Sequence, residues 1–226
     1  MTLSMGVWIG EDDKINTQQL EIMKKVLTKY PRKMFDSVFV GNEVLFRQDK
    51  TTNELIEIIQ DVKHFVKKIG YFDLPVGTSE IGSLIDGRLL QACDIVGANI
   101  HPFFGGIDVS MATDWTYDFL KYQIEPINKS HKTKLVITEV GWPYRGGRYE
   151  GSVANATNFQ YFMNAWLCES QKYDIDYYFF EAFDEPWKKI FYEDGNTWET
   201  EWGIFTSDRQ MKPGVQFPKC SKNHNL

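Results

Sequence analysis

Short apolar runs alternate along this chain with longer segments in which apolar residues recur at helical spacing. The runs predict strands at residues 3–9, 37–41, 75–79, 94–100, 134–139 and 177–183. The segments between them predict helices at residues 17–30, 52–69, 82–92, 114–128 and 152–172. Strands that alternate with helices are typical of parallel βα units. The sequence therefore predicts an α/β fold.

Local signals mark the ends of some predicted helices. Thr51 and Glu54 have the spacing of a capping box, and Gly70 stands where a left-handed residue commonly ends a helix. In the segment 114–128, Asp114 can cap the start and Pro126 should end or kink the helix. Asp12 or Asp13 can cap the first helix, with a solvated turn as the alternative.

The predicted strands favour a barrel over a nucleotide-binding sheet. No glycine-rich phosphate loop follows any of them, which disfavours the doubly wound fold. The runs 37–41 and 134–139 are apolar on both faces, as buried parallel strands are. A (β/α)8 TIM barrel usually has about 250 residues. With 226 residues and six predicted strands, the chain should be one domain over residues 1–226 in which two strands are overlooked or lacking.

Charge and cysteine content exclude several classes of protein. The net charge is −6, so there is no basic footprint for nucleic acid. No apolar run approaches the roughly 18 residues of a membrane helix, and the first residues lack the basic region of a signal peptide. Three cysteines, Cys93, Cys168 and Cys220, are too few for a disulfide scaffold, and no Cys/His set has zinc spacing. Their pairing stays open, and we expect no metal site.

Two glutamates, Glu43 and Glu139, each come after a run of apolar strand residues, at or just beyond the end of a predicted strand. Function in a TIM barrel lies where the strands end. A pair of carboxyl groups is the minimum equipment for glycoside hydrolysis, because one group protonates the leaving oxygen and the other attacks the anomeric carbon. A separation of about 5–5.5 Å gives retention of configuration, and about 6.5–9.5 Å gives inversion. The alternative is two solvated or salt-bridged loop glutamates.

Other polar and aromatic side chains cluster at the same predicted strand ends. The polar ones are Asn42, Asn99, His101, Glu185 and Lys188. The aromatic ones, which could stack on pyranose rings or plug the core, are Phe103, Phe104, Trp142 and Trp187. His101 could bind a sugar hydroxyl or the nucleophile, or be a structural histidine. Asp184, Glu185 and Lys188 could line a cleft as an ion-pair network or belong to a solvated loop.

Four motifs together resemble glycoside hydrolase family 17, the β-1,3-glucan hydrolases and glucanosyltransferases. They are Val40-Gly41-Asn42-Glu43, residues 136–143 around Thr138-Glu139, residues 179–188 ending in Glu185-Pro186-Trp187-Lys188, and Trp202-Gly203-Ile204-Phe205 with Asp208-Arg209. The resemblance runs from residue 3 to about residue 220 and looks closest to the fungal membrane-anchored endo-β-1,3-glucanases.

The resemblance implies a role for each matching residue. Glu43 would be the acid/base and Glu139 the nucleophile of a retaining endo-hydrolase or glucanosyltransferase, with Glu185 and Lys188 as a supporting pair. Asn42, Asn99 and His101 match polar residues at the family's strand ends. With Glu185, Lys188 and the four aromatic side chains named above, they are the residues expected to contact β-1,3-glucan. The reaction would pass through a glucosyl-enzyme that is released to water or to another glucan. It would need no metal or organic cofactor.

The family's barrel also implies how this chain is organised. Residues 3–9 would correspond to the third barrel strand, so we expect a glycoside hydrolase domain that lacks the first two βα units. A secretion signal or membrane anchor would lie upstream, which implies an extracellular, cell-wall location and a monomer. The alternatives are an inactive barrel remnant with weak glucan binding, and a barrel enzyme that uses two carboxylates on another glycan.

Overall fold

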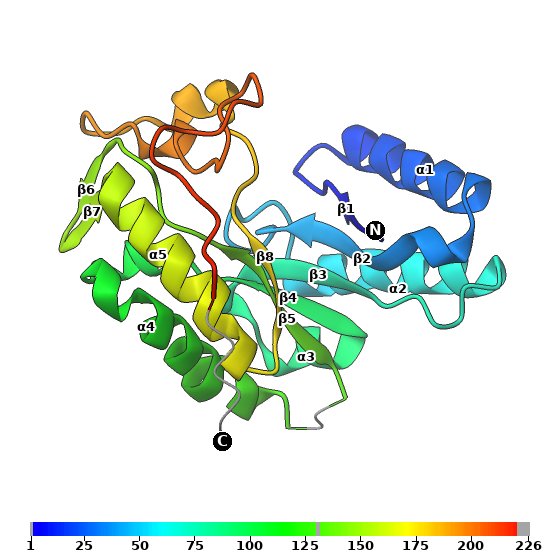
Figure 1. Ribbon diagram of the computed structural model, residues 1–226. Coiled ribbons are helices and arrows are strands. Elements are labelled where there is room, and N and C mark those ends of the chain that lie inside the picture. The colour runs from blue at the N-terminus through cyan, green and yellow to red at the C-terminus, as the bar shows by residue number, and fades with distance from the viewer. Residues whose placement is uncertain (1, 130–131, 221–226) are drawn as a thin grey trace. The chain divides into compact units, whose positions relative to one another are not determined.

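The computed structural model describes residues 2–129 and 132–220. The chain forms two compact units (Figure 1). The first unit comprises residues 1–99 and 121–136, and the second comprises residues 100–120 and 137–226. Strand β5 (Lys134–Val140) belongs to both, because its first three residues lie in the first unit and the rest in the second.

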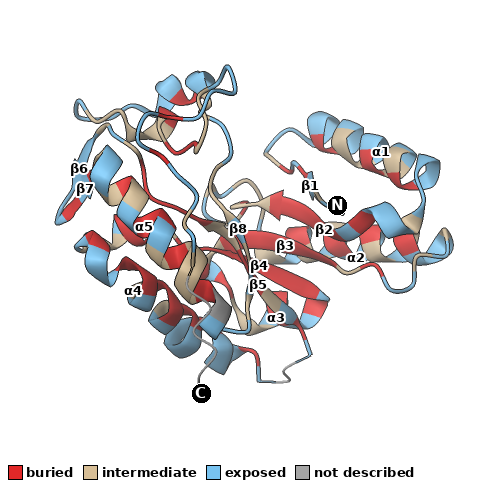
Figure 2. Ribbon diagram, viewed as in Figure 1, coloured by how far each residue is buried: buried red, intermediate tan, exposed pale blue. Residues whose placement is uncertain are grey.

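The first unit is a parallel sheet covered by helices. Its strands are β1 (Leu3–Val7), β2 (Phe35–Asn42), β3 (Val76–Ile81) and β4 (Ile95–Asn99). They pair side by side in chain order, and all three pairings are parallel. Figure 2 shows β2 and β3 buried along most of their length. Burial of nearly every residue confirms that the apolar run 37–41 is an internal strand.

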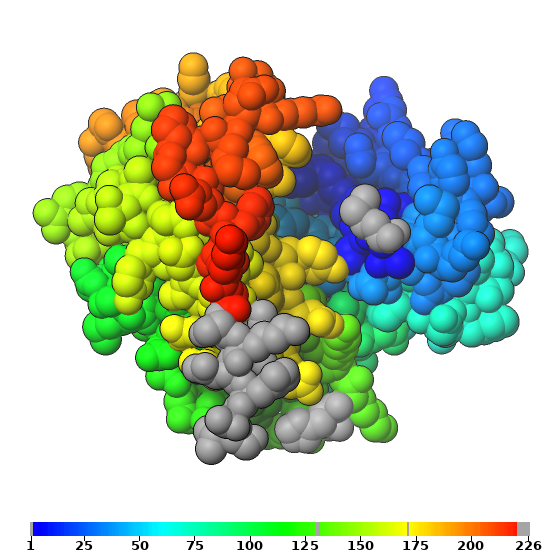
Figure 3. All heavy atoms as spheres, in the orientation of Figure 1, coloured from blue at the N-terminus to red at the C-terminus, as the bar shows by residue number. Residues whose placement is uncertain are grey.

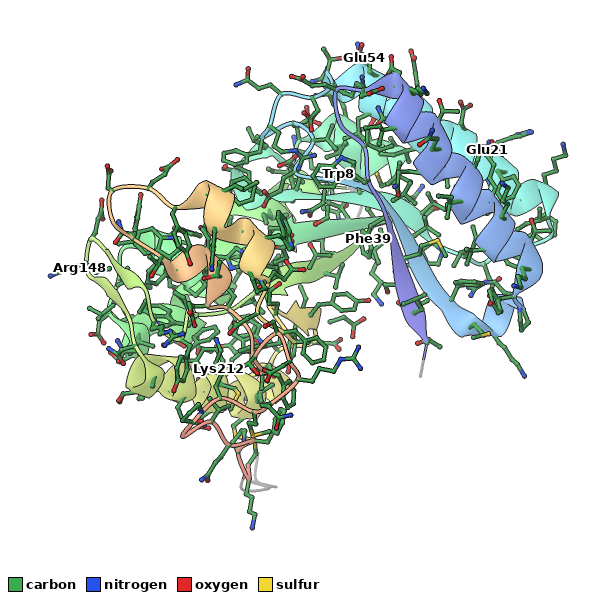
Figure 4. All side chains as sticks on the ribbon, turned by 90° about the horizontal axis from the view of Figure 1, so that it is seen from above. Trp8, Glu21, Phe39, Glu54, Arg148 and Lys212 are labelled. Atoms are coloured by element: carbon green, nitrogen blue, oxygen red, sulfur yellow. A yellow bond between two sulfur atoms is a disulfide. The ribbon has the colours of Figure 1, made fainter. Side chains whose placement is uncertain are left out.

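The helices of the first unit are α1 (Asp13–Lys29), α2 (Thr52–Lys68) and α3 (Gly87–Ala92). The capping box of α2 is confirmed, and Gly70 has the predicted positive φ, +87°. Helix α1 begins four residues before the predicted start, because the Asp12 side chain accepts hydrogen bonds from the backbone of Lys14 and Ile15. Glu21 and Glu54 mark the exposed sides of α1 and α2 in Figure 4.

The second unit contains α4 (Ala112–Phe119), α5 (Ala156–Glu169) and β8 (Asp176–Phe179), which pairs with β5. It also has a hairpin of β6 (Gly147–Tyr149) and β7 (Ser152–Ala154), from which Arg148 points outward in Figure 4. The hairpin lies partly in the predicted helix 152–172 and was not predicted. The predicted strand 177–183 is too long at its end, since β8 stops at Phe179.

The remaining helical turns are short. The 3-10 helices are Arg32–Met34, Gly82–Leu84, Pro102–Gly105, Val109–Met111, Glu125–Ile127, Ser170–Lys172, Pro186–Phe191 and Trp198–Thr200, and Leu120–Ile124 is a π-helix. The predicted helix 114–128 is therefore α-helical only to Phe119. Its start has no side-chain cap, so the predicted capping role of Asp114 is wrong. Pro126 falls in the last 3-10 turn of that stretch, consistent with its inability to continue an α-helix.

The C-terminal segment runs along α5 on the surface of the second unit (Figures 1 and 3). Val215 packs against Phe159 and Met163, and the side chain of Gln160 hydrogen-bonds both backbone groups of Gln216. A disulfide joins Cys168 at the end of α5 to Cys220. Cys93, in the first unit, is a buried free thiol. These contacts settle the cysteine pairing that the sequence left open.

No helix within residues 2–129 and 132–220 is long and apolar enough to cross a membrane.

Candidate active-site residues

Glu43 lies on a tight turn at the end of β2. Gly41 has a φ of +80°, and a side chain there would place its Cβ 2.4 Å from Val44 Cγ2, so only glycine fits. Glu43 itself has a φ of +55°, which is uncommon for a residue with a side chain. Its backbone N–H donates to the carbonyl of Ser79 at 2.9 Å. The turn thus fixes the backbone position from which the Glu43 side chain extends.

Asn99, at the end of β4, holds the two residues that end and follow β2. Its Nδ2 donates to Glu43 Oε1 at 2.8 Å and to Asn42 Oδ1 at 3.0 Å. Its Oδ1 accepts from the hydroxyl of Ser79 at 2.8 Å, which orients the amide. The structure therefore brings together three of the residues predicted for the site, Asn42, Glu43 and Asn99, in the first unit.

Glu80 was missed by the sequence analysis, although it supports the loop of Glu43. It is fully buried, and its two carboxylate oxygens accept from the backbone N–H groups of Leu45 and Ile81, each at 2.8 Å. Burial raises the pKa of Glu80, these backbone hydrogen bonds oppose the rise, and the charge of Glu43 adds to it. Glu80 directly follows the predicted strand 75–79, as Glu43 follows the strand 37–41 at a short distance, and this position was the signal available in the sequence.

Trp8, just after β1, is a second overlooked residue of the first unit. The guanidinium of Arg47 lies 4.2 Å from the centre of its ring and pairs with Asp49 at 2.7 Å. Arg47 also donates to the carbonyls of Asn42 and Ile9. Arg47 therefore ties the tryptophan after β1 to the residue that precedes Glu43. Figure 4 labels Trp8 near the end of β1.

In the second unit, Glu139 on β5 pairs with His101. The two side chains meet at 3.1 Å between His101 Nε2 and Glu139 Oε2, and the backbone N–H of Ile100 donates to the Glu139 carbonyl at 2.9 Å. The His101 ring is packed edge-on against Trp202 and Phe180, with ring centres 4.9 and 5.1 Å away. His101 is therefore placed to orient the Glu139 carboxylate.

Lys188 is a buried cation between two carboxylates. Its Nζ lies 2.8 Å from Glu185 and 3.1 Å from both oxygens of Glu181, and 4.5 Å from the centre of the Phe180 ring. The predicted Glu185–Lys188 pair is present, and Glu181 is an additional partner that the sequence analysis missed. Burial raises the pKa of Glu181 to about 7, Lys188 opposes the rise, and Glu185 and Glu139 add to it.

The predicted aromatic residues separate into two groups. Phe103 and Trp142 are fully buried in the second unit, with ring centres 5.3 Å apart, and the Trp142 N–H donates to the carbonyl of Val153 at 2.9 Å. A ring with no exposed face cannot stack on a sugar, so we no longer expect direct contact for these two. Phe104 and Trp187 are exposed.

In the part of the chain that the structure describes, no group of three His, Cys, Asp or Glu side chains is arranged for metal binding. The carboxylates at the strand ends are instead held by amide, imidazole and ammonium groups. That arrangement is suited to acid/base and nucleophilic chemistry at a carboxyl group.

Carboxylates at strand ends, with aromatic side chains beside them, are what a glycoside hydrolase of this fold needs. The sequence model of the BtgE/BtgC glycoside hydrolase domain matches residues 1–203, and the chain belongs to this family. The resemblance to glycoside hydrolase family 17 is confirmed by this match and by the relatives described next.

Curated relatives are fungal proteins. The chain is 39% identical to a protein of Aspergillus fumigatus named probable glucan endo-1,3-beta-glucosidase btgC, over 97% of this chain and 34% of that protein. It is 36% identical to glucan endo-1,3-beta-glucosidase btgC of Emericella nidulans, over 97% of this chain and 36% of that protein. The chain thus spans about a third of the length of these relatives.

Solved structures agree with the fold. The family 17 β-1,3-glucanosyltransferase of Rhizomucor miehei is 27% identical, with a TM-score of 0.83 over 96% of this chain and 76% of that one. An active-site mutant of a β-1,3-glucanosyltransferase from the same organism, in complex with laminaritriose, gives a TM-score of 0.84 with the same identity and coverage. The sequence prediction of a mostly parallel sheet with covering helices is therefore confirmed.

Proposed function

We propose that this chain is the catalytic domain of a retaining β-1,3-glucan endo-hydrolase or glucanosyltransferase. The observation that supports it most is that Glu43 directly follows β2, Glu139 is the last residue but one of β5, and each is held by a polar side chain, Asn99 or His101. The names of the fungal relatives and the laminaritriose complex of the similar glucanosyltransferase support β-1,3-glucan as the substrate.

In this proposal Glu139 is the nucleophile and Glu43 the acid/base. Glu139 attacks the anomeric carbon while Glu43 protonates the departing glycosidic oxygen, which leaves a glucosyl ester on Glu139. Glu43 then removes a proton from water or from an acceptor hydroxyl, which attacks the same carbon and frees Glu139. Two inversions give overall retention, and the acceptor decides between hydrolysis and transfer.

The other predicted site residues position these two groups or the sugar. Asn99 and His101 orient the carboxylates. Asn42 and Glu185 offer hydrogen-bonding groups to the glucan and Phe104 a ring face, while the buried Lys188 holds Glu181 and Glu185 in place. Phe103 is a core residue that packs against Phe104, with ring centres 5.4 Å apart, and Trp142 packs against Phe103 in turn.

The chain is proposed to work outside the cell as a monomer on cell-wall glucan. The Cys168–Cys220 disulfide supports this location, because disulfides persist in oxidising compartments and are rare in the cytosol. The substrate is itself a wall polymer in this proposal.

The test is cleavage of β-1,3-glucan by the unmodified chain and by Glu139→Gln and Glu43→Gln, with Glu21→Gln on the exposed side of α1 as the matched control. We expect the first two variants to fold and to lose at least about 1,000-fold in kcat, since each loses a group that acts in the transition state. β-1,4- and β-1,6-glucans should be poor substrates. Unchanged turnover in Glu139→Gln would refute the assignment, and laminaritriose binding without any cleavage would favour an inactive glucan-binding domain.

A further inference from the structure

The 3-10 helix Pro186–Phe191 buries a charged side chain and exposes three large apolar ones. Its cation, Lys188, is only 9% exposed, whereas Trp187, Ile190 and Phe191 are 58%, 77% and 51% exposed. Lysine is almost never buried without partners, and large apolar side chains that gather on a surface commonly mark a binding site. We call Trp187, Ile190 and Phe191 the outer patch.

The helix that carries the outer patch is fixed by contacts at both of its ends. Lys188 is bound by Glu181 and Glu185, and its backbone N–H donates to the carbonyl of Glu185 at 3.0 Å. At the other end, the hydroxyl of Tyr192 lies 2.5 Å from that of Thr200. The rings of Trp187 and Phe191 meet at an angle of 74° with their centres 5.9 Å apart. These contacts fix the short helix on which the three exposed apolar side chains lie close together in sequence.

We propose that the outer patch binds a β-1,3-glucan chain at sugars beyond those held at Glu139. This inference rests on the proposed function and adds a binding surface to it. Trp187 precedes Lys188, which binds Glu185 and Glu181. The charge of Glu139 acts on Glu181, so the outer patch adjoins residues that surround the predicted nucleophile in the second unit. Flat aromatic rings with an apolar body bury the apolar faces of sugar rings well.

The charges around the outer patch favour a neutral polysaccharide over an anionic lipid surface. The neighbouring exposed residues are Lys189, Glu193 and Asp194, one cation with two anions. A segment that binds anionic lipid carries a cluster of several basic residues instead. A neutral glucan is not repelled by such a mixed rim. The outer patch should therefore strengthen binding of long glucans and have little effect on a trisaccharide.

The experiment uses the whole 226-residue chain with Glu139→Gln, so that glucan is not consumed. Binding to insoluble β-1,3-glucan is measured by pelleting, and binding to laminaritriose by calorimetry. The test variants are Ile190→Ser/Phe191→Ala and, separately, Trp187→Ala. The matched control is Phe72→Ala, because Phe72 is 78% exposed in the first unit.

We expect Ile190→Ser/Phe191→Ala to bind insoluble glucan on the order of tenfold more weakly and laminaritriose within about twofold of the parent. Trp187→Ala should weaken pelleting at least as much, and Phe72→Ala should bind both ligands like the parent. Equal pelleting of all variants, or the same loss in Phe72→Ala, would overturn the proposal.

A second measurement separates the lipid alternative and the underlying function. Vesicles of phosphatidylcholine with phosphatidylserine should not bind the parent chain. Vesicle binding that the patch variants abolish, with glucan binding intact, would assign the patch to a lipid surface and overturn the proposal. If the parent itself fails to bind laminaritriose, the proposed function fails together with this inference, whereas a failure confined to insoluble glucan overturns the outer patch alone.

Discussion

One amide group holds both residues at the end of β2: Asn99 Nδ2 lies 2.8 Å from Glu43 Oε1 and 3.0 Å from Asn42 Oδ1. Asn99 comes from the end of β4, which is not the strand next to β2. Ser79 on the strand between them fixes the amide through a 2.8 Å hydrogen bond. The direction of the Glu43 carboxylate is therefore set by three strand ends together.

Replacing Asn99 with alanine should lower kcat/KM for β-1,3-glucan by about 10- to 100-fold, since a hydrogen bond to a charged group contributes about 1.5–3 kcal/mol. Ser79→Ala removes a contact that orients the amide but leaves the amide itself, so the loss in kcat/KM should be smaller. Steady-state kinetics of both variants, with circular dichroism to check folding, measure this. An unchanged Asn99→Ala enzyme would show that the contact has no part in positioning Glu43.

Glu181 should make stability depend on pH. Burial raises its folded pKa from the model-peptide 4.5 to about 7, so the folded state binds more protons than the unfolded state between these values. The stability that the protonated form has below pH 4.5 is lost as pH rises through about 7. Glutamine at this position cannot ionise. From pH 5 to pH 8 the free energy of unfolding of Glu181→Gln should therefore rise relative to that of the unmodified chain, by at most about 3 kcal/mol.

Urea unfolding of both proteins at pH 5 and pH 8 measures that difference. If the difference in free energy of unfolding between the two proteins stays constant or shrinks as pH rises, Glu181 is ionised in the folded chain throughout this range.

The buried cation Lys212 should be important for stability. Its Nζ lies 2.7 Å from Asp184 and 3.4 Å from Glu201, and it anchors the C-terminal segment within the second unit (Figure 4). Lys212→Met leaves both carboxylates without this partner and should lower the free energy of unfolding by about 3–5 kcal/mol. The control is Lys24→Met in the exposed Lys24–Glu21 pair, which should cost less than about 1 kcal/mol. Equal effects of the two variants would refute the role given to burial.

The three cysteines should differ in chemistry. The disulfide closes a separation of 52 residues, so the double variant Cys168→Ser/Cys220→Ser should have a free energy of unfolding about 3–4 kcal/mol lower than the unmodified chain.

Burial raises the pKa of the Cys93 thiol to about 12, and at pH 8 almost none of it is thiolate. Mass spectrometry after iodoacetamide should find the native chain unlabelled and the urea-unfolded chain labelled once. Rapid labelling of the native chain would contradict the buried thiol.

Features that depend on neighbours in sequence could be predicted well. The capping box of Thr51 and Glu54 and the left-handed Gly70 are local devices, and both are present. Each of the six strands predicted from runs of apolar residues corresponds to an observed strand, with ends that differ by a few residues. The positions of Glu43 and Glu139 at strand ends followed from the same runs.

Features that depend on distant contacts could not be predicted. The apolar pattern continues past Phe179, but the chain leaves the sheet there, because Glu181 exchanges backbone hydrogen bonds with Trp202 and Ile204. The same break places Glu181 against Lys188, which explains why this carboxylate was missed. The burial of Phe103 and Trp142 likewise depends on the hairpin and on Trp198, which come later in the chain.

The central claim is that Glu139 forms a covalent glucosyl intermediate. Its most direct test is proton NMR of the first sugar released from β-1,3-glucan, recorded before the anomers equilibrate, with Glu139→Gln as the inactive reference. Retention predicts that the new reducing end is the β-anomer and that Glu139→Gln releases none. Release of the α-anomer, or β-product at an unchanged rate from Glu139→Gln, would contradict the account.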